Sequence, residues 1–126
     1  MSIKINKPWG FEIKLTEDNL PYTSKIAFTK AGQRWSLQSH DQKTETITLL
    51  SGQAKFRIGD SIFDMIPNTG YTITTNTIHR FEAITDCVTI EASTPEVGNT
   101  IRIEDDYSRP TETESIRNSP NRGYQQ

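Results

Sequence analysis

The feature that most constrains the fold of this chain is its succession of short runs rich in Ile, Val, Thr, Phe and Tyr between turn-forming sequences. Nowhere does an apolar stripe with a period of 3.6 residues persist over three turns, so the pattern indicates strands rather than helices. Turn sequences such as AGQ, SGQ, GDS and PNTG suit antiparallel hairpins. Many short strands favour a barrel or jelly roll, because closing a sheet removes its exposed edges. Ten strands are predicted, over residues 11–16, 24–29, 35–40, 45–51, 54–58, 61–66, 70–75, 79–84, 87–93 and 100–104.

The length and the distribution of apolar residues predict one domain followed by a polar tail. A chain of 126 residues builds a single core of moderate size. Hydrophobic residues make up only 33% of it, and residues 110–126 contain two prolines and a single aliphatic residue, Ile116. Such a segment cannot offset the entropy of its own ordering by burying apolar side chains. We therefore expect a domain over residues 1–109 and a flexible tail over residues 110–126.

Charge and cysteine content exclude several classes of function. A net charge of -2 with both signs interspersed provides no basic field for nucleic acid or an anionic membrane. The single cysteine, Cys87, excludes an intramolecular disulfide and an all-cysteine zinc site, and is expected to be a buried core residue. The N-terminal sequence MSIKINKPWG lacks the apolar core of a signal peptide, so the expected location is the cytoplasm.

The stretch SLQSHDQKTE combines polar residue types that can bind a metal. In a strand, Gln38 and His40 lie on one face, because side chains alternate with a period of two. Glu45 can join them from the next strand if a turn at about DQKT folds the chain back. Taken alone, these three residues fit a metal site, and they fit a solvated polar strand face as well.

The spacing of glycines and ligand-type residues resembles the two sequence motifs of the cupin superfamily. Residues 67–81 resemble the second motif, with His79 as its last ligand. The first motif is matched with Gln in place of its first histidine, and spacings of five, one, four and six residues separate Gly32, Gln38, His40, Glu45 and Gly52. The resemblance implies a metal set of Gln38, His40, Glu45 and His79.

Further segments resemble the cupin half of type II mannose-6-phosphate isomerase, the C-terminal domain of bifunctional mannose-1-phosphate guanylyltransferases. The resemblance covers about residues 5–109, and its most specific segments are KPWG at the start and EDDYSR at the end. It implies an all-β cupin fold, a double-stranded β-helix or jelly-roll barrel. It also implies one divalent metal, with zinc expected and nickel, manganese or iron acceptable, and a homodimer.

The resemblance implies an aldose–ketose isomerase acting on a sugar phosphate such as mannose 6-phosphate. The reaction moves a proton between adjacent carbons through an enediol, so it needs a Lewis acid at the sugar oxygens and a base. Glu91 is the expected base, with Lys25 as the second choice. Cations expected to bind the phosphate are Lys43, Arg80 and Arg109.

One segment departs from the isomerase pattern and leaves two alternatives open. The family reads HHHRAEHW around the glutamate, whereas this chain has Asp41, Gln42, Lys43, Thr46 and Ile47 at the changed positions. A non-catalytic or regulatory sugar-binding cupin would keep the ligands without turnover. Another metal-dependent cupin enzyme, an oxygenase or a sugar-nucleotide epimerase, would use the same ligands for different chemistry.

Overall fold

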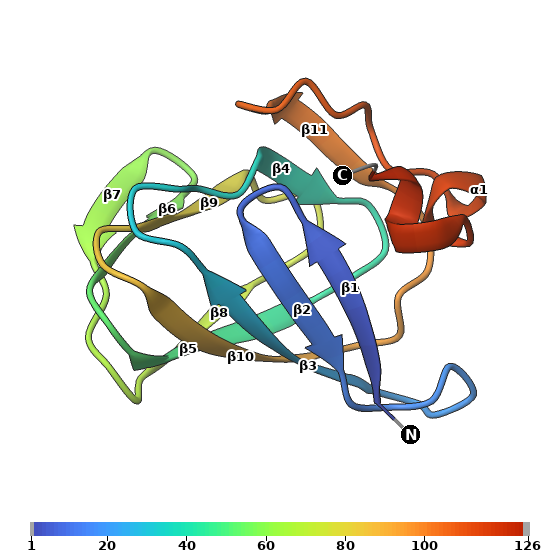
Figure 1. Ribbon diagram of the computed structural model, residues 1–126, viewed down its shortest axis with the longest axis horizontal. Coiled ribbons are helices and arrows are strands. Elements are labelled where there is room, and N and C mark those ends of the chain that lie inside the picture. The colour runs from blue at the N-terminus through green and yellow to red at the C-terminus, as the bar shows by residue number, and fades with distance from the viewer. Residues whose placement is uncertain (1, 125–126) are drawn as a thin grey trace.

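The protein is built almost entirely of strands, as predicted. The computed structural model describes residues 2–124 and contains one short helix, α1 (Glu114–Arg117), and one 3₁₀ turn, η1 (Pro120–Gly123), both near the C-terminus (Figure 1). The strands are β1 (Ile3–Lys7), β2 (Gly10–Lys14), β3 (Thr23–Thr29), β4 (Leu37–His40), β5 (Glu45–Ser51), β6 (Ala54–Ile58), β7 (Ser61–Asp64), β8 (Gly70–Ile73), β9 (His79–Ala83), β10 (Cys87–Ser93) and β11 (Thr100–Glu104).

Two antiparallel sheets face each other and enclose the interior (Figure 1). The larger sheet has the order β1-β2-β3-β10-β5-β8, and the smaller has the order β11-β4-β9-β6-β7. Neighbours far apart in sequence, such as β10 between β3 and β5, give the crossing connections of a jelly roll. The predicted all-β jelly-roll class is therefore confirmed, and no helix among residues 2–124 is long and apolar enough to cross a bilayer.

All ten predicted strands are present, and one strand, β1, was not predicted. Strand β1 pairs with β2 through a tight connection in which Lys7 opposes Gly10. Its sequence IKINK alternates apolar and polar residues, but Pro8 and the small number of apolar residues hide the signal. Strand β4 is shorter than predicted and begins at Leu37 instead of Trp35.

An aromatic-rich core fills one part of the space between the sheets. The ring of Trp35 packs in a tilted arrangement 4.7 Å from Phe81 and 5.5 Å from Trp9, measured between ring centroids. Cys87 is buried in this cluster, as expected from the sequence. Its other buried members are Ala27, Ile47, Leu49, Ala54, Phe56, Met65, Ile73 and Ala83.

The larger sheet turns polar side chains inward along part of its length. On β3, Lys25 and Thr29 are buried while Ile26 and Phe28 lie half-buried on the outer face. Strands β2 and β10 follow the same alternation, with Glu12 and Glu91 inside. The space between the sheets therefore has an apolar part and a charged part, and the charged part contains the candidate site.

The C-terminal segment packs against the domain, in contrast to the flexible tail expected from its composition. Glu112, only 3% exposed, exchanges two backbone hydrogen bonds of 2.9 Å with Thr100. Arg117 donates to the carbonyl oxygens of Gly98 at 2.6 Å and Glu96 at 3.3 Å. Hydrogen bonds and ion pairs hold this segment, so its lack of apolar residues does not prevent packing. Figure 1 shows it beside β11.

Candidate metal centre

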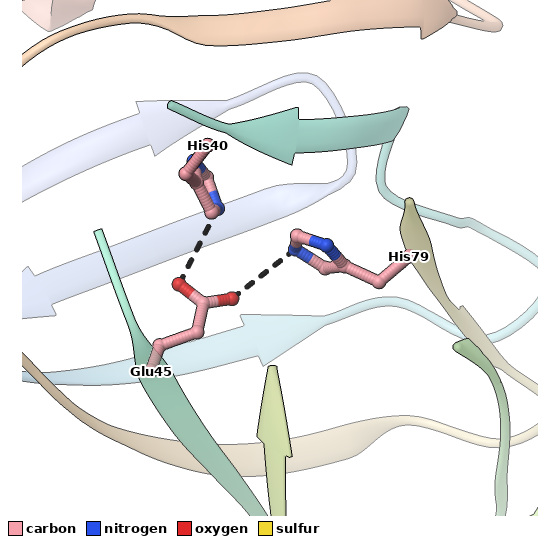
Figure 2. A group of neighbouring side chains, drawn as sticks. All are labelled: His40, Glu45 and His79. Carbon is pink, nitrogen blue, oxygen red and sulfur yellow. Dashed lines mark ion pairs between the residues drawn. The ribbon is translucent and has the colours of Figure 1, made fainter. Parts of the chain in front are cut away.

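Three side chains from three strands meet inside the charged part of the interior. His40 ends β4, Glu45 begins β5 and His79 begins β9, so strand ends bring them together. Figure 2 shows the two imidazoles pointing at the carboxylate between them. One potential ligand atom from each residue lies within 4.8 Å of the others, and all three side chains are buried.

The distances within this group are those of a compact ligand cluster. Nε2 of His79 lies 3.2 Å from Oε1 of Glu45, and Nε2 of His40 lies 3.4 Å from Oε2. Nε2 of His40 is buried and makes no hydrogen bond. An unpaired buried ring nitrogen is costly. The position of Nε2, facing the carboxylate of Glu45, therefore suits a nitrogen that binds a metal ion.

Hydrogen bonds at the far side of each imidazole orient the rings. Nδ1 of His79 donates to the carbonyl oxygen of Thr77 at 2.9 Å, and Nδ1 of His40 lies 3.1 Å from the hydroxyl of Thr100. A protonated Nδ1 leaves the lone pair on Nε2, the nitrogen that faces Glu45. The carbonyl of Thr77 thus holds His79 in the tautomer that a metal ligand requires, and the Thr100 hydroxyl can accept from His40 in the same tautomer.

Gln38 lies next to this group but presents its amide nitrogen to it. Gln38 is directly opposite His79 in the β4–β9 pair, and its Nε2 lies 3.4 Å from Nε2 of His79. Its Oε1 accepts a hydrogen bond of 2.7 Å from Ser36. Turning the amide over would direct Oε1 at the centre of the group, and the Ser36 hydroxyl could then accept from the amide.

The electrostatic environment favours a neutral His40 and an ionised Glu45. Burial, together with the ammonium of Lys43, lowers the pKa of His40 to about 4. Burial alone would raise the pKa of Glu45, but the nearby ammonium of Lys43 holds it well below its ordinary value. Neutral imidazoles and a carboxylate are the protonation states that bind a divalent metal. Nitrogen and carboxylate donors of this kind suit zinc and other first-row metals.

A narrow cavity of about 50 Å³, which we call the inner cavity, adjoins this group. Gln38, His40 and Glu45 contribute to its wall. The rest of the wall is strongly charged, with carboxylates from Glu12, Glu91, Glu96 and Glu112 and cations from Lys7, Lys25, Lys43, Arg102, Arg109 and Arg122.

Lys43, Glu91 and Lys25 extend the group as a chain of buried charges. The ammonium of Lys43 lies 2.8 Å from Oε2 of Glu45 and forms an ion pair with it. The angle of approach does not suit a hydrogen bond, so Oε2 accepts none. The same ammonium is 3.5 Å from Oε2 of Glu91, which in turn lies 3.9 Å from Lys25. Burial raises the pKa of Glu91, and the nearby lysines only partly oppose this shift.

The structure brings the predicted site residues to the inner cavity except His79, which contacts the ligand group, and Arg80, which lies apart from both. Arg109 lines the cavity while its side chain pairs with Asp105 at 3.0 Å. Arg80 donates to the carbonyl oxygen of Trp35 at 2.8 Å and pairs with Asp106 at 3.2 Å, away from the cavity. Strand alternation accounts for this, since His79 points inward and Arg80 therefore points outward.

Several lining residues were missed by sequence reasoning. Lys7 is the first residue of the KPWG motif and Arg102 lies two residues before the EDDYSR segment, so both lie in or beside motifs that were recognised. Arg122 lies in the segment expected to be a tail and gives no signal in the sequence. The others are Glu12, Glu96 and Glu112.

Comparison with known families gives one match, which covers most of the chain. The model of the family described as mannose-6-phosphate isomerase C-terminal matches residues 1–111. A search of the curated proteins returned no relative.

Solved structures show the same fold at low sequence identity. CapF from Staphylococcus aureus, a capsular polysaccharide assembling protein, aligns with a TM-score of 0.65 at 17% identity over 88% of this chain and 33% of CapF. A cupin-2 domain from Rhodospirillum rubrum aligns with a TM-score of 0.67 at 16% identity over 77% of this chain and 66% of that one. KdgF from Halomonas sp. aligns with a TM-score of 0.62 at 13% identity over 71% of this chain and 83% of KdgF. The predicted cupin fold is confirmed, and this chain spans about a third of CapF.

Proposed function

Because the chain belongs to the mannose-6-phosphate isomerase C-terminal family, we propose that it is a metal-dependent aldose–ketose isomerase acting on a sugar phosphate. The observation that carries the proposal is the convergence of His40, Glu45 and His79, with ligand atoms within 4.8 Å of one another. Gln38 would be the fourth ligand once its amide is turned over, and zinc is the metal that this donor set suits best.

The side chains around the ligands fit the proton transfer that the reaction needs. A bound divalent metal would act as a Lewis acid that polarises the sugar carbonyl. Glu91 is the base in this proposal, taking the proton from one carbon and returning it to the next. Its raised pKa suits a group that must both accept and release a proton near neutral pH. Lys25, close to Glu91, would tune that carboxylate and is the second choice for the base.

Cations without close carboxylate partners are the best candidates for binding the phosphate. The carboxylate nearest to Lys7 is that of Glu12 at 3.7 Å, and burial lowers the pKa of Lys7 to about 8. Arg102 lies 3.8 Å from Glu112, and its buried Nε has no hydrogen-bond partner. We add both residues to Lys43 and Arg109 as phosphate-binding candidates, and we assign Arg80 to its outer ion pairs instead.

The metal is tested first, by elemental analysis of the purified protein. One equivalent of a divalent metal is expected, with nitrogen ligands at about 2.0–2.1 Å if it is zinc. The chain has two histidines, so His40→Ala combined with His79→Ala removes every imidazole and should abolish metal uptake. Gln53→Ala, at an exposed turn outside the cavity, is the matched control. Tight binding by the double variant would refute the site.

Turnover is tested by screening hexose and pentose phosphates for conversion between aldose and ketose. Glu91→Gln should lower the turnover number by at least about 100-fold, the usual contribution of a general base, with metal content unchanged. Glu82→Gln, on the β9 strand but outside the cavity, should leave turnover intact. A product formed equally well by the Glu91 variant would remove Glu91 from the mechanism.

The same screen separates the isomerase from its alternatives. Of the departing positions, Asp41 binds the backbone and side chain of Asn99 at 2.7 and 2.9 Å, and only Lys43 lines the inner cavity. The other four departing positions therefore lie outside the cavity wall. Affinity for a sugar phosphate without product would favour a binding cupin, and oxygen consumption with iron would favour an oxygenase. The homodimer and the cytoplasmic location stay predictions, and sedimentation velocity would test the first.

A further inference from the structure

A second, larger cavity lies on the other side of the C-terminal segment. This outer cavity has a volume of about 570 Å³ and is walled by β1, the loop around Pro95 and residues 114–122. Two of the described residues, Glu96 and Arg122, line both the outer and the inner cavity. The pair they form is therefore the partition between the outer cavity and the space next to the metal ligands.

The partition is a bidentate ion pair. NH2 and NH1 of Arg122 donate to the two carboxylate oxygens of Glu96 at 2.7 and 2.8 Å. NH1 also lies 3.4 Å from Oε1 of Glu112. The side chains of Arg122 and Glu96 are 9% and 6% exposed. A charge-assisted pair of this kind, shielded from water, holds the segment firmly while it is intact.

The backbone at the partition can open locally. Asn121 and Arg122 adopt φ angles of 48° and 53°, a left-handed conformation that is unfavourable for residues other than glycine. Their anchors are the Arg122 ion pairs and one hydrogen bond of 3.2 Å from the backbone of Asn6 to Asn121. Helix α1 is held separately, by Arg117 on Glu112 and on the Gly98 carbonyl. Residues 119–123 can thus leave without unfolding α1.

The two cavities differ in what they can hold. An inner cavity of about 50 Å³ holds a few water molecules. Sites for small-molecule ligands usually measure about 300–1,000 Å³, a range that the outer cavity reaches and the inner cavity does not. The outer cavity is therefore large enough for a sugar phosphate, and the closed partition separates it from the space next to the metal ligands.

We propose that the Glu96–Arg122 pair is a gate, which residues 119–123 open to admit an anionic substrate from the outer cavity to the metal ligands. The substrate class rests on the proposed function, whereas the gate itself does not. A phosphate offers the guanidinium the same bidentate geometry as the carboxylate, so opening exchanges one ion pair for another. Glu96 lies within residues 1–111, the part matched by the family, and Arg122 lies beyond it.

The gate is tested on metal-free protein by the reactivity of its histidines toward diethyl pyrocarbonate. The only two histidines of the chain are His40 and His79, both inside the partition and 5% and 0% exposed. Wild-type protein should react slowly. Arg122→Ala should raise the rate of carbethoxyhistidine formation at least about tenfold, the effect of losing a charge-assisted pair. Arg57→Ala, on the far β6 strand, is the matched control and should react like wild type.

Two further variants and a urea series test the same ion pair. Glu96→Gln breaks the same pair from the other side and should also react faster, whereas Arg122→Lys should restore part of the protection. In wild-type protein, low urea concentrations should change the rate little, because a local opening exposes little surface. Equal rates in wild type and both pair-breaking variants, or a wild-type rate that follows global unfolding, would overturn the gate. A protein with this reactivity pattern that bound no metal would refute the proposed function and leave the gate intact.

Discussion

At the scale of single residues, the glycine of the KPWG motif shows what a short sequence signature encodes. Gly10 has a φ of 154°, and a Cβ atom at this position would lie 1.9 Å from the carbonyl oxygen of Phe28. Strands β2 and β3 can approach this closely only without a side chain at residue 10. The glycine of the motif therefore permits a close backbone contact between β2 and β3, which holds the β1–β2 hairpin against the rest of the sheet.

We expect Gly10→Ala to lower the free energy of unfolding by about 1–3 kcal/mol, the usual cost of forcing atoms into a filled space. Gly32→Ala is the matched control, because Gly32 also has a positive φ of 78° but no atom within 4 Å of the added Cβ. Urea denaturation of both variants measures the difference. Equal losses would mean that conformational preference, and not the close approach, explains the glycine.

At the scale of the elements, strands β2, β3 and β10 place their charged residues inside the barrel and their large apolar residues on the outer face. Glu12 on β2 illustrates the consequence, with Lys25 at 3.5 Å and Lys7 at 3.7 Å. Burial alone would raise the pKa of Glu12, but Lys25, Lys7 and Arg122 outweigh it and lower the pKa to about 2. The ionised carboxylate thus stabilises the folded state.

Stability should therefore fall in acid, between pH 4.5 and about 2. In this window the unfolded chain binds a proton at Glu12 and the folded chain does not, so the stabilisation present above pH 4.5 is lost as the pH falls. The lowered pKa corresponds to about 3 kcal/mol at most. Urea melts across this range should show a shallower pH dependence for Glu12→Gln than for wild type. An identical slope in both proteins would assign the acid sensitivity to Glu96 and Glu112, whose pKa values are also lowered.

At the scale of the whole molecule, the C-terminal segment completes a charge network that the strands alone leave open. Glu96 pairs with Lys25 at 3.1 Å and Lys14 at 3.7 Å, and with Arg122 from the segment. Glu112 from the segment is in turn the carboxylate nearest to Arg102 of β11. Removing the segment leaves buried charges without partners, which is destabilising.

We expect stepwise truncation of the C-terminal segment to lower the stability of the protein. Ending the chain after Asn118 removes Arg122 and should lower the free energy of unfolding by about 1–3 kcal/mol, the cost of leaving a buried partner unpaired. Ending it after Pro110 also removes Glu112 and Arg117 and should cost more. Glu114→Gln, at an exposed position of α1, is the control. Thermal melts equal to that of the full chain would instead support the flexible tail that the composition predicts.

The sequence by itself determined the strand pattern, the fold and the residues of the candidate metal centre. Ten of the eleven strands follow from alternation and turn signals, because these are local properties of the chain. Gln38, His40, Glu45 and His79 follow from the resemblance to the cupin motifs, whose spacing this chain matches.

Only the tertiary structure decided which strand face is inside and what closes the cavity. Alternation in FEIK and SKIAFT separates charged from apolar residues, but the same alternation fits either orientation of the face, and here the charged one is buried. Long-range packing decides that Arg80 lies outside the inner cavity and that Arg122 lines it. Arg122 binds Glu96, 26 residues earlier in the chain, and such an ion pair leaves no periodic trace in the sequence. Composition predicts whether a segment can bury apolar surface, whereas the C-terminal segment is held by paired charges, whose partners only the folded chain brings within reach.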